Sequence, residues 1–457
     1  MLPGCRRYLQ RPNANKYAGS LFKGDAEFRR KLLALQTSKI RNAAQVVTVS
    51  ADGKSFKIKE QMNEIGLIEN ATVIVGSDGT IIDVGPEEVL SNKYKDFTFE
   101  TDIDATGKSI IPGFVDGHTH PVWTGDRVHE FAMKLAGATY MDIHKMGGGI
   151  GFTVNHTRDA SKEELKDLLH QRLNRMMKYG TTTVEAKSGY GLETETEMKM
   201  LEVLHEVNAV HPVDVVSTYL GAHSVPKGKT AAEATEDILN RQIPELMRRR
   251  EEGKISPRNI DVFLEKGVFE GEDTKKILEA GKTAGLLLNF HGDEIHPMCS
   301  GQLGGELGAA AISHLERVDD EGIIAMAKKP TVAVLLPTTA YILRLEPPPA
   351  RKLIEGNVPV ALGSDYNPNA HCMSMPNVMN LACVLMKMTM NEALVAATLN
   401  SAASLELSHK YGSIETGKQG DFVIIDHSRW EHIIYEMVDP PIHSVVKGGK
   451  VVFSNRT

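Results

Sequence analysis

Cysteine and long apolar runs are scarce in this sequence, and each shortage excludes a class of protein. The 457 residues include four cysteines and no Cys-x-x-Cys pair. So sparse a set argues against a disulfide framework and favours a reducing compartment, so we predict a cytoplasmic protein in which Cys299, Cys372 and Cys383 are structural. No apolar run approaches the roughly 18 residues of a membrane span, so no membrane partner is expected.

Positive charge is not in excess either. The chain carries 52 lysines and arginines against 59 acidic residues, which gives a net charge of −7. Such a chain has no basic surplus with which to release counterions from a nucleic acid, so no nucleic-acid partner is expected. Hydrophobic residues make up 41% and charged residues 24%, which excludes disorder over most of the chain. The length suits one large domain with a smaller one.

Two interpretations fit the N-terminal extension, residues 1–40. Its first 23 residues contain five basic side chains and no acidic one, as in a mitochondrial presequence. A clear amphipathic period is missing, so we favour an extension that frays from the domain behind it.

Residues 113–410 alternate between short apolar segments and helical stretches. The helical stretch at 161–180 opens with Ser161 and has Glu164 three residues later, the pattern of a capping box. Strands that are apolar throughout and alternate with helices predict a parallel sheet covered on both faces. About eight such units over about 300 residues predict an α/β fold of the (β/α)8 TIM-barrel type. An open doubly wound sheet is the alternative, but its phosphate-binding loop is absent.

Both ends of the chain have β character. The runs AQVVTVS and ATVIVGS lie near the start, and VVKGGKVVF near the end predicts a hairpin. The most economical arrangement is one small β-sandwich domain built from both chain ends, residues 41–112 and 411–457, around the barrel at 113–410.

Polar residues follow most of the predicted barrel strands. Because barrel enzymes place their chemistry at the carboxyl ends of the strands, these residues are the candidate site. In strand order they are His118 and His120, then Tyr190, His223, His291 with Glu294, His314, and Asp365 with Asn367.

Three histidines and one aspartate of this group form a metal-ligand set. His118 and His120 are two apart on a strand and so share a face. With His291 and Asp365 they offer three nitrogens and one oxygen, which suits one divalent ion, zinc or iron. An open position on such an ion lowers the pKa of water, and Asp365 is placed to accept a proton from it. Two isolated histidines would mean little; the strand-end order of all four carries the prediction.

Other polar residues have a functional and a plain interpretation. Glu294 is a proton donor to a substrate nitrogen, or a solvated loop residue. His314 is a fourth nitrogen ligand or a neighbour that polarises water or a carbonyl, or a buried histidine bonded to backbone. Arg127 binds a carboxylate through two hydrogen bonds of its guanidinium, or lies on the surface. Tyr140 and Tyr190 are hydroxyl candidates for the same pocket.

The motif HTH after IPGFVDG, with the later histidines and aspartate, resembles the amidohydrolase superfamily over roughly residues 44–457. More narrowly, the chain is similar to the imidazolonepropionase family. That resemblance is carried by GDRVHEF at 125–131, KSGYGL at 187–192, GAHSVP at 221–226, FHGDEI at 290–295, SHLE at 313–316 and GSDYNPNAHC at 363–372.

The resemblance implies hydrolysis of 4-imidazolone-5-propanoate to N-formimidoyl-L-glutamate in histidine degradation. It implies one metal ion on His118, His120, His291 and Asp365, with His314 beside it as a catalytic residue. It implies substrate contacts from a further set: Arg127, Tyr140, Tyr190, His223, Glu294, Asn367, Asn369 and Ala370. A homodimer is an expectation from the family alone.

One loop departs from the family pattern. Bacterial members resemble Asn-Pro-Gly followed by a hydroxyl residue, whereas this chain has Asn367-Pro368-Asn369-Ala370, as animal members do. The rival functions are another amidohydrolase, acting on a purine-like ring or a different cyclic amide, and a metal-free barrel scaffold. Arg127 favours an anionic substrate over a neutral nucleobase. No convincing bridging lysine follows the fourth strand, which disfavours a binuclear site.

Overall fold

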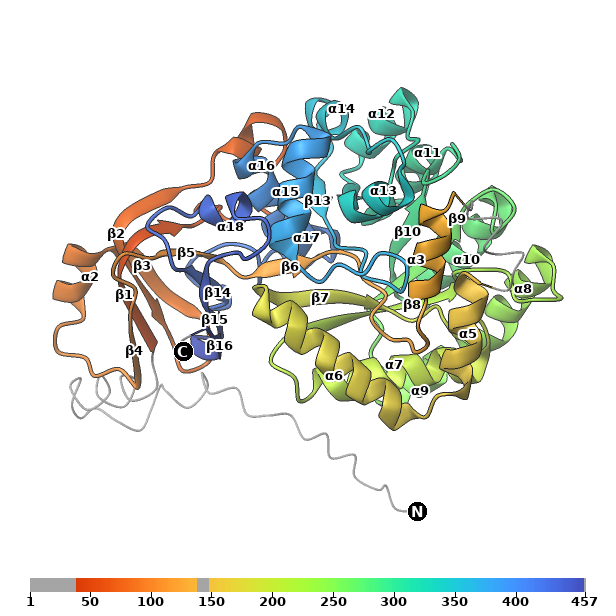
Figure 1. Ribbon diagram of the computed structural model, residues 1–457, viewed down its shortest axis with the longest axis horizontal. Helices are drawn as coiled ribbons and strands as arrows, with labels where there is room; N and C mark the ends of the chain where they lie inside the picture. The colour runs from red at the N-terminus through yellow and green to blue at the C-terminus, as the bar shows by residue number, and fades with distance from the viewer. Residues whose placement is uncertain (1–37, 138–147, 456–457) are drawn as a thin grey trace, which may run out of the picture.

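The computed structural model describes residues 38–137 and 148–455, and most of them build a parallel barrel (Figure 1). Eight consecutive strands pair in chain order, each parallel to the next, as the alternating sequence pattern predicts. They are β6 (Phe114–Asp116), β7 (Thr181–Lys187), β8 (Asp214–Ala222), β9 (Asn259–Leu264), β10 (Leu287–Gly292), β11 (Ala311–His314), β12 (Val332–Leu335) and β13 (Val360–Leu362). Nearly all of their residues are buried, because helices cover the outside of the barrel.

Backbone hydrogen bonds between the first and eighth strands close the barrel just past the ends of β6 and β13. The amide of Asp365 donates to the carbonyl of His118 at 2.9 Å, and the amide of His120 donates to the carbonyl of Tyr366 at 2.9 Å. The seam of the barrel therefore runs through three of the four predicted metal ligands.

Amphipathic helices cover the barrel. In α6 (Lys162–Lys178) the buried side chains include Leu165, Leu169 and Leu173, and the Ser161 hydroxyl accepts from the amide of Glu164 at 3.1 Å. Half of the predicted capping box is therefore present, since the Glu164 side chain accepts from the Thr124 hydroxyl at 3.4 Å. The other helices around the barrel are α3 (Val128–Leu135), α5 (Ile150–Asp159), α7 (Thr194–Asn208), α8 (Ala231–Asp237), α9 (Ile243–Glu251), α10 (Gly271–Thr283), α11 (Ser300–Leu307), α12 (Asp320–Lys328), α13 (Pro337–Leu343), α14 (Ala350–Glu355), α15 (Met375–Met386), α16 (Met390–Ala396) and α17 (Leu399–Ser404). Within the described residues, no helix combines the length and apolarity that a bilayer crossing needs.

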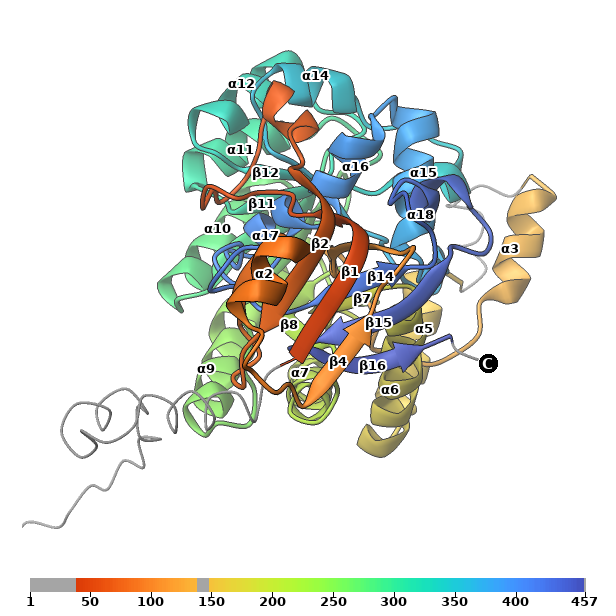
Figure 2. The same cartoon turned by 90° about the vertical axis from the view of Figure 1, so that its left-hand side faces the viewer.

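The two chain ends meet in a second sheet (Figure 2). Its strands are β1 (Ser38–Val47), β2 (Leu67–Val75), β3 (Ile81–Pro86), β4 (Thr101–Asp104), β5 (Ser109–Pro112), β14 (Phe422–Ile425), β15 (Ile442–Lys447) and β16 (Lys450–Ser454). Strand β14 runs antiparallel to β5, with Ile424 opposite Ile110, and this pair joins the C-terminal strands to the N-terminal ones. Side chains from both groups, among them Val46 and Val446, share a hydrophobic core. The predicted small β domain from both chain ends is confirmed.

Candidate metal centre and active site

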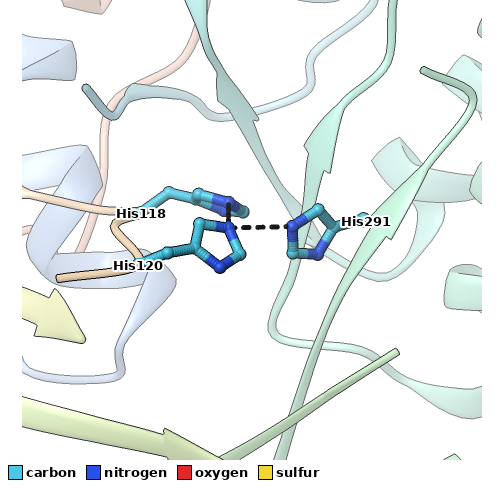
Figure 3. Close-up of side chains that lie close together, drawn as sticks. All are labelled: His118, His120 and His291. Carbon is cyan, nitrogen blue, oxygen red and sulfur yellow. Dashed lines mark hydrogen bonds between the residues drawn. The ribbon is translucent and has the colours of Figure 1, made fainter. Parts of the chain in front are cut away.

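Three imidazoles converge at the carboxyl end of the barrel (Figure 3). The Nε2 atom of His120 lies 3.2 Å from Nε2 of His118 and 3.2 Å from Nε2 of His291. His118 and His120 follow β6, and His291 lies in β10, so the group spans the barrel interior. All three side chains are buried, and burial lowers the pKa of each. The rings are therefore neutral, which is the form that binds metal.

The position of the proton on His291 decides whether its Nε2 atom can bind a metal ion. Its Nδ1 lies 2.9 Å from a carboxylate oxygen of Asp261, which only accepts hydrogen bonds. Nδ1 therefore carries the proton and Nε2 presents a lone pair to the neighbouring imidazoles. An imidazole with its proton on Nδ1 can donate the Nε2 lone pair to a divalent ion, so the convergence of the three rings suits a metal site.

Asp365 completes the group of donors. Its Oδ1 lies 3.5 Å from Nε2 of His118 and 3.5 Å from Nε2 of His120, and its Oδ2 accepts a hydrogen bond from the Thr339 hydroxyl. Oδ1 is buried and has no hydrogen-bond partner among the described residues. An unpartnered buried carboxylate oxygen facing imidazole nitrogens fits a bound divalent ion. The residues present therefore suit zinc or ferrous iron.

A buried ion network positions two parts of this group. The Lys187 ammonium lies 2.8 Å from a carboxylate oxygen of Glu185 and 2.8 Å from Oδ2 of Asp261. Asp261 binds His291, as described above, and Glu185 accepts at 3.2 Å from the amide of Thr119, which lies between the two histidines of the HTH motif. Burial raises the pKa of Asp261, but His291 and Lys187 outweigh it and lower the pKa to about 2. The charged network thus connects both halves of the metal-ligand set.

His314 and Glu294 form a second titratable pair beside the imidazoles. Nε2 of His314 lies 3.6 Å from a Glu294 oxygen, and Nδ1 lies 3.8 Å from Glu316. Burial raises the pKa of Glu294 to about 7. Burial lowers the pKa of His314, but Glu294, Glu316 and Asp365 outweigh it and raise the pKa to about 10. Such a pair can hold and pass a proton near neutral pH.

Backbone strain marks His314 and Asp365. Both have left-handed φ angles, 78° and 46°, which non-glycine residues adopt at a free-energy cost of roughly 1–3 kcal/mol. His314 ends β11 and Asp365 follows β13, so the strain falls where the strands leave the barrel. His314 is not among the nitrogens that converge on one point, which are those of His118, His120 and His291.

A cavity of about 430 Å3 opens over this group. Of the residues predicted for substrate binding, Arg127, Tyr190, His223, Glu294, Asn367 and Asn369 line it, together with His120, His291, His314 and Asp365. Arg127 is buried, so its interpretation as a surface residue is wrong. Its Nε and Nη2 donate to one oxygen of Glu130 at 2.9 and 2.7 Å, and this leaves the edge formed by Nη1 and Nη2 for a ligand.

His223 presents a defined acceptor to the cavity. Its Nδ1 lies 2.9 Å from the carbonyl of Gly189 and must donate to it, and its ring stacks on that of His120 with centroids 4.8 Å apart. Burial lowers the pKa of His223 to about 3. The ring is therefore neutral, and Nε2 is a hydrogen-bond acceptor.

The loop that departs from the bacterial pattern is organised by Asn367. Its side-chain oxygen accepts from the amides of Asn369 at 2.7 Å and Ala370 at 3.0 Å. Ala370 is buried beneath the loop and is not among the residues that line the cavity. Tyr140 lies outside the described residues.

Several residues that shape the site escaped the sequence analysis. Asp261 and Glu185 lie inside their strands and Lys187 ends β7, and the sequence analysis assigned none of them a role. Glu130 and Glu316 act on their near neighbours Arg127 and His314, whereas Thr339 bonds Asp365 from a different element. A usable signal was the spacing of Glu185 and Lys187: two charged residues at i and i+2 of a strand share one face, and both are buried here.

Comparison with solved structures identifies the fold class. A triazine hydrolase variant superimposes with a TM-score of 0.71 at 15% identity over 92% of this chain and 95% of that one. A zinc-bound adenosine deaminase from Xanthomonas campestris gives 0.67 at 17% identity, with 92% and 93% covered. A sequence profile of the amidohydrolase family matches residues 270–452. Barrel, small β domain and converging imidazoles together define an amidohydrolase, a class of metal-dependent hydrolases.

Relatives with a much higher sequence identity than these structures show which family of amidohydrolases the chain belongs to. The chain is 65% identical over 418 residues to a probable imidazolonepropionase of Dictyostelium discoideum, covering 91% of this chain and 98% of that protein. It is 56% identical over 416 residues to a probable imidazolonepropionase of Homo sapiens, with 91% and 98% covered. The chain belongs to the imidazolonepropionase family, and it is a hydrolase acting on carbon–nitrogen bonds.

Proposed function

We propose that this protein hydrolyses 4-imidazolone-5-propanoate to N-formimidoyl-L-glutamate, a step of histidine degradation. The observation that carries the proposal is one cavity with two chemically distinct parts: a metal-type donor set, to which His120, His291 and Asp365 belong, and the guanidinium of Arg127. The first part suits hydrolysis of an amide bond and the second suits a substrate with a carboxylate.

His118, His120, His291 and Asp365 would hold one divalent ion, zinc or iron. Such an ion makes water more acidic and polarises a carbonyl group when it is bound. Its ligands are neutral imidazoles and one carboxylate, a combination that both metals accept.

The residues around the donor set handle protons. Water adds to the ring carbonyl carbon, the bond from that carbon to the ring nitrogen breaks, and the nitrogen takes up a proton. Asp365 is the acceptor for the proton of water, because its buried carboxylate lies in the cavity beside the imidazoles of the donor set. Glu294, with its pKa raised to about 7 by burial, delivers a proton to the departing nitrogen. His314, held cationic by the surrounding carboxylates, stabilises the negative charge on the carbonyl oxygen.

The other lining residues bind and orient the substrate. Arg127 takes the propanoate with the edge that Glu130 leaves open, and Tyr190 lies in the same cavity. His223 accepts a hydrogen bond from a ring N–H through its Nε2 atom. These contacts align the carbonyl carbon with the donor set, and alignment is itself a large contribution to rate.

Freshly generated imidazolonepropanoate tests the proposal, since its ultraviolet absorbance disappears on ring opening. We expect loss of absorbance, formation of formimidoylglutamate, arrest after prolonged treatment with a chelator, and recovery when zinc or ferrous ion is restored. Guanine and adenosine serve as comparison substrates and are expected to be inert. Turnover of a purine without turnover of imidazolonepropanoate would overturn the proposal.

A further inference from the structure

Among the described residues, one end of the cavity has two cations, Arg127 and Lys134, and one carboxylate, Glu130, close to them. Helix α3 begins directly after Arg127 and places Glu130 and Lys134 three and seven residues further on, so all three share one helical face. Arg127 and Lys134 both line the cavity, and Lys134 is half-buried. Burial lowers the pKa of Lys134 and repulsion from Arg127 lowers it further, as expected for two cations held close together.

Glu130 pairs directly with the first of these cations and acts on the second only from a distance. One of its oxygens accepts both hydrogen bonds from Arg127, and the other accepts from the amide of Gly149 at 2.8 Å. Within residues 38–137 and 148–455, no carboxylate lies within ion-pair distance of the Lys134 ammonium. Its hydrogen-bond partner is the neutral side-chain oxygen of Asn369.

The carboxylates that line the same cavity are engaged elsewhere. Asp365 faces the imidazoles of His118 and His120, and Glu294 faces His314. In the described part of the chain, the cavity therefore offers an ammonium without a paired carboxylate beside the open edge of a guanidinium. A single carboxylate between Lys134 and Arg127 would neutralise this end.

We propose that Lys134 is a second cation of the substrate-carboxylate subsite and determines, together with Arg127, the preference for an anionic side chain. The inference rests on the proposed function and adds a residue to it. An ammonium has three donors, and among the residues that the structure describes Asn369 accepts from one of them, so donors remain for a carboxylate. The planar guanidinium of Arg127 fixes the direction of the contact with the substrate carboxylate, and the ammonium of Lys134 adds a second positive charge beside it.

Asn369 fixes the place of this ammonium. It comes from the loop after the eighth barrel strand, whereas Lys134 comes from the helix after the first, and their contact joins the two across the cavity. A glycine at position 369, as in the bacterial pattern, has no amide oxygen with which to hold the lysine. The Asn-Ala departure in this chain therefore gives the loop a positioning role toward the substrate carboxylate.

The test compares ligands that differ only in charge. Binding of 3-(imidazol-4-yl)propanoate and of its neutral amide is measured by calorimetry on the metal-loaded protein, which requires no turnover. We expect the wild-type protein to prefer the carboxylate, and Lys134→Met to weaken carboxylate binding by about 10- to 100-fold while it changes amide binding by less than about threefold. Lys134→Arg should restore most of the preference, and Asn369→Gly should lose part of it.

Kinetics provide a second measurement and a control. For Lys134→Met we expect the KM for imidazolonepropanoate to rise by a similar factor, with a much smaller change in kcat. Lys162→Met, at a lysine of α6 paired with Glu202 and Glu206 outside the cavity, is the matched control. Equal losses for carboxylate and amide would assign Lys134 a structural role and overturn the inference, as would unchanged carboxylate binding. Absence of turnover in the wild-type protein would instead overturn the proposed function, and the binding measurement would still decide the role of Lys134.

Discussion

Replacement of Lys187 by methionine tests whether the buried ion network supports the fold as well as the metal site. Methionine has a side chain of similar length but lacks the charge, so the change removes the ammonium that separates Glu185 from Asp261. Both contacts are 2.8 Å long, and the side chains of all three residues are at most 1% exposed.

The burial of the three side chains determines how much stability the Lys187→Met variant should lose. Removing one partner of a buried ion pair leaves its counter-charge without solvent or partner, and this destabilises proteins by about 3–5 kcal/mol. Lys162→Met is the matched comparison, because Lys162 also contacts two carboxylates, Glu206 at 2.6 Å and Glu202 at 3.3 Å, but its side chain is 34% exposed. Exposed pairs contribute only about 0.2–1 kcal/mol, so the two variants should differ by several kcal/mol.

Urea unfolding of chelator-treated protein, followed by circular dichroism, measures the two free energies without a contribution from bound metal. A Glu185→Gln/Lys187→Met double variant should recover part of the stability, since it removes one of the two uncompensated charges together with the lysine. The reasoning is refuted if Lys187→Met and Lys162→Met lose the same stability, or if the double variant is less stable than Lys187→Met alone.

Three further predictions concern separate parts of the molecule. Asp365→Asn should lower kcat by about 10²–10⁴ while the circular dichroism spectrum stays unchanged, and near-wild-type turnover would remove the carboxylate from the chemistry. Asp261→Asn should weaken metal binding by about 10- to 100-fold in competition with a chromophoric chelator, because a neutral amide in place of the carboxylate makes the His291 ring a weaker metal ligand; equal affinity would contradict this. His211, whose Nδ1 accepts from the amide of Val213 at 3.1 Å, has its pKa lowered to about 4 by burial and by a neighbouring histidine. Between pH 6.5 and 4 the unfolded chain therefore binds more protons than the native one, so stability should fall as the pH falls through this window, and His211→Gln should flatten that slope in unfolding experiments.

The arrangement of the barrel could be predicted from the sequence because its determinants are local. Apolar strand segments and amphipathic helices alternate regularly, and a parallel sheet covered on both faces is the arrangement that buries them. The pairing of β14 with β5 was harder to foresee in detail, since Ile424 and Ile110 lie far apart in the chain and their register depends on the finished sheet.

Some residues of the candidate site could likewise be predicted from the sequence, and others could not. His118, His120, His291 and Asp365 were found because strand ends in a parallel barrel meet at one face. Asp261 was missed because its role depends on which neighbour lies opposite it in the barrel, and that depends on strand register. The roles assigned to individual site residues, the domain boundaries, the compartment and a homodimer remain predictions.

The seam of the barrel has a consequence for how the protein is made. His118 and His120 are supplied by the first strand and Asp365 by the eighth, about 250 residues later. A nascent polypeptide that ends at the seventh strand therefore contains His118, His120 and His291 but lacks Asp365. Under the proposed assignment, the complete donor set would form only after synthesis of the last barrel strand, and an ion bound there would link the first strand to the last.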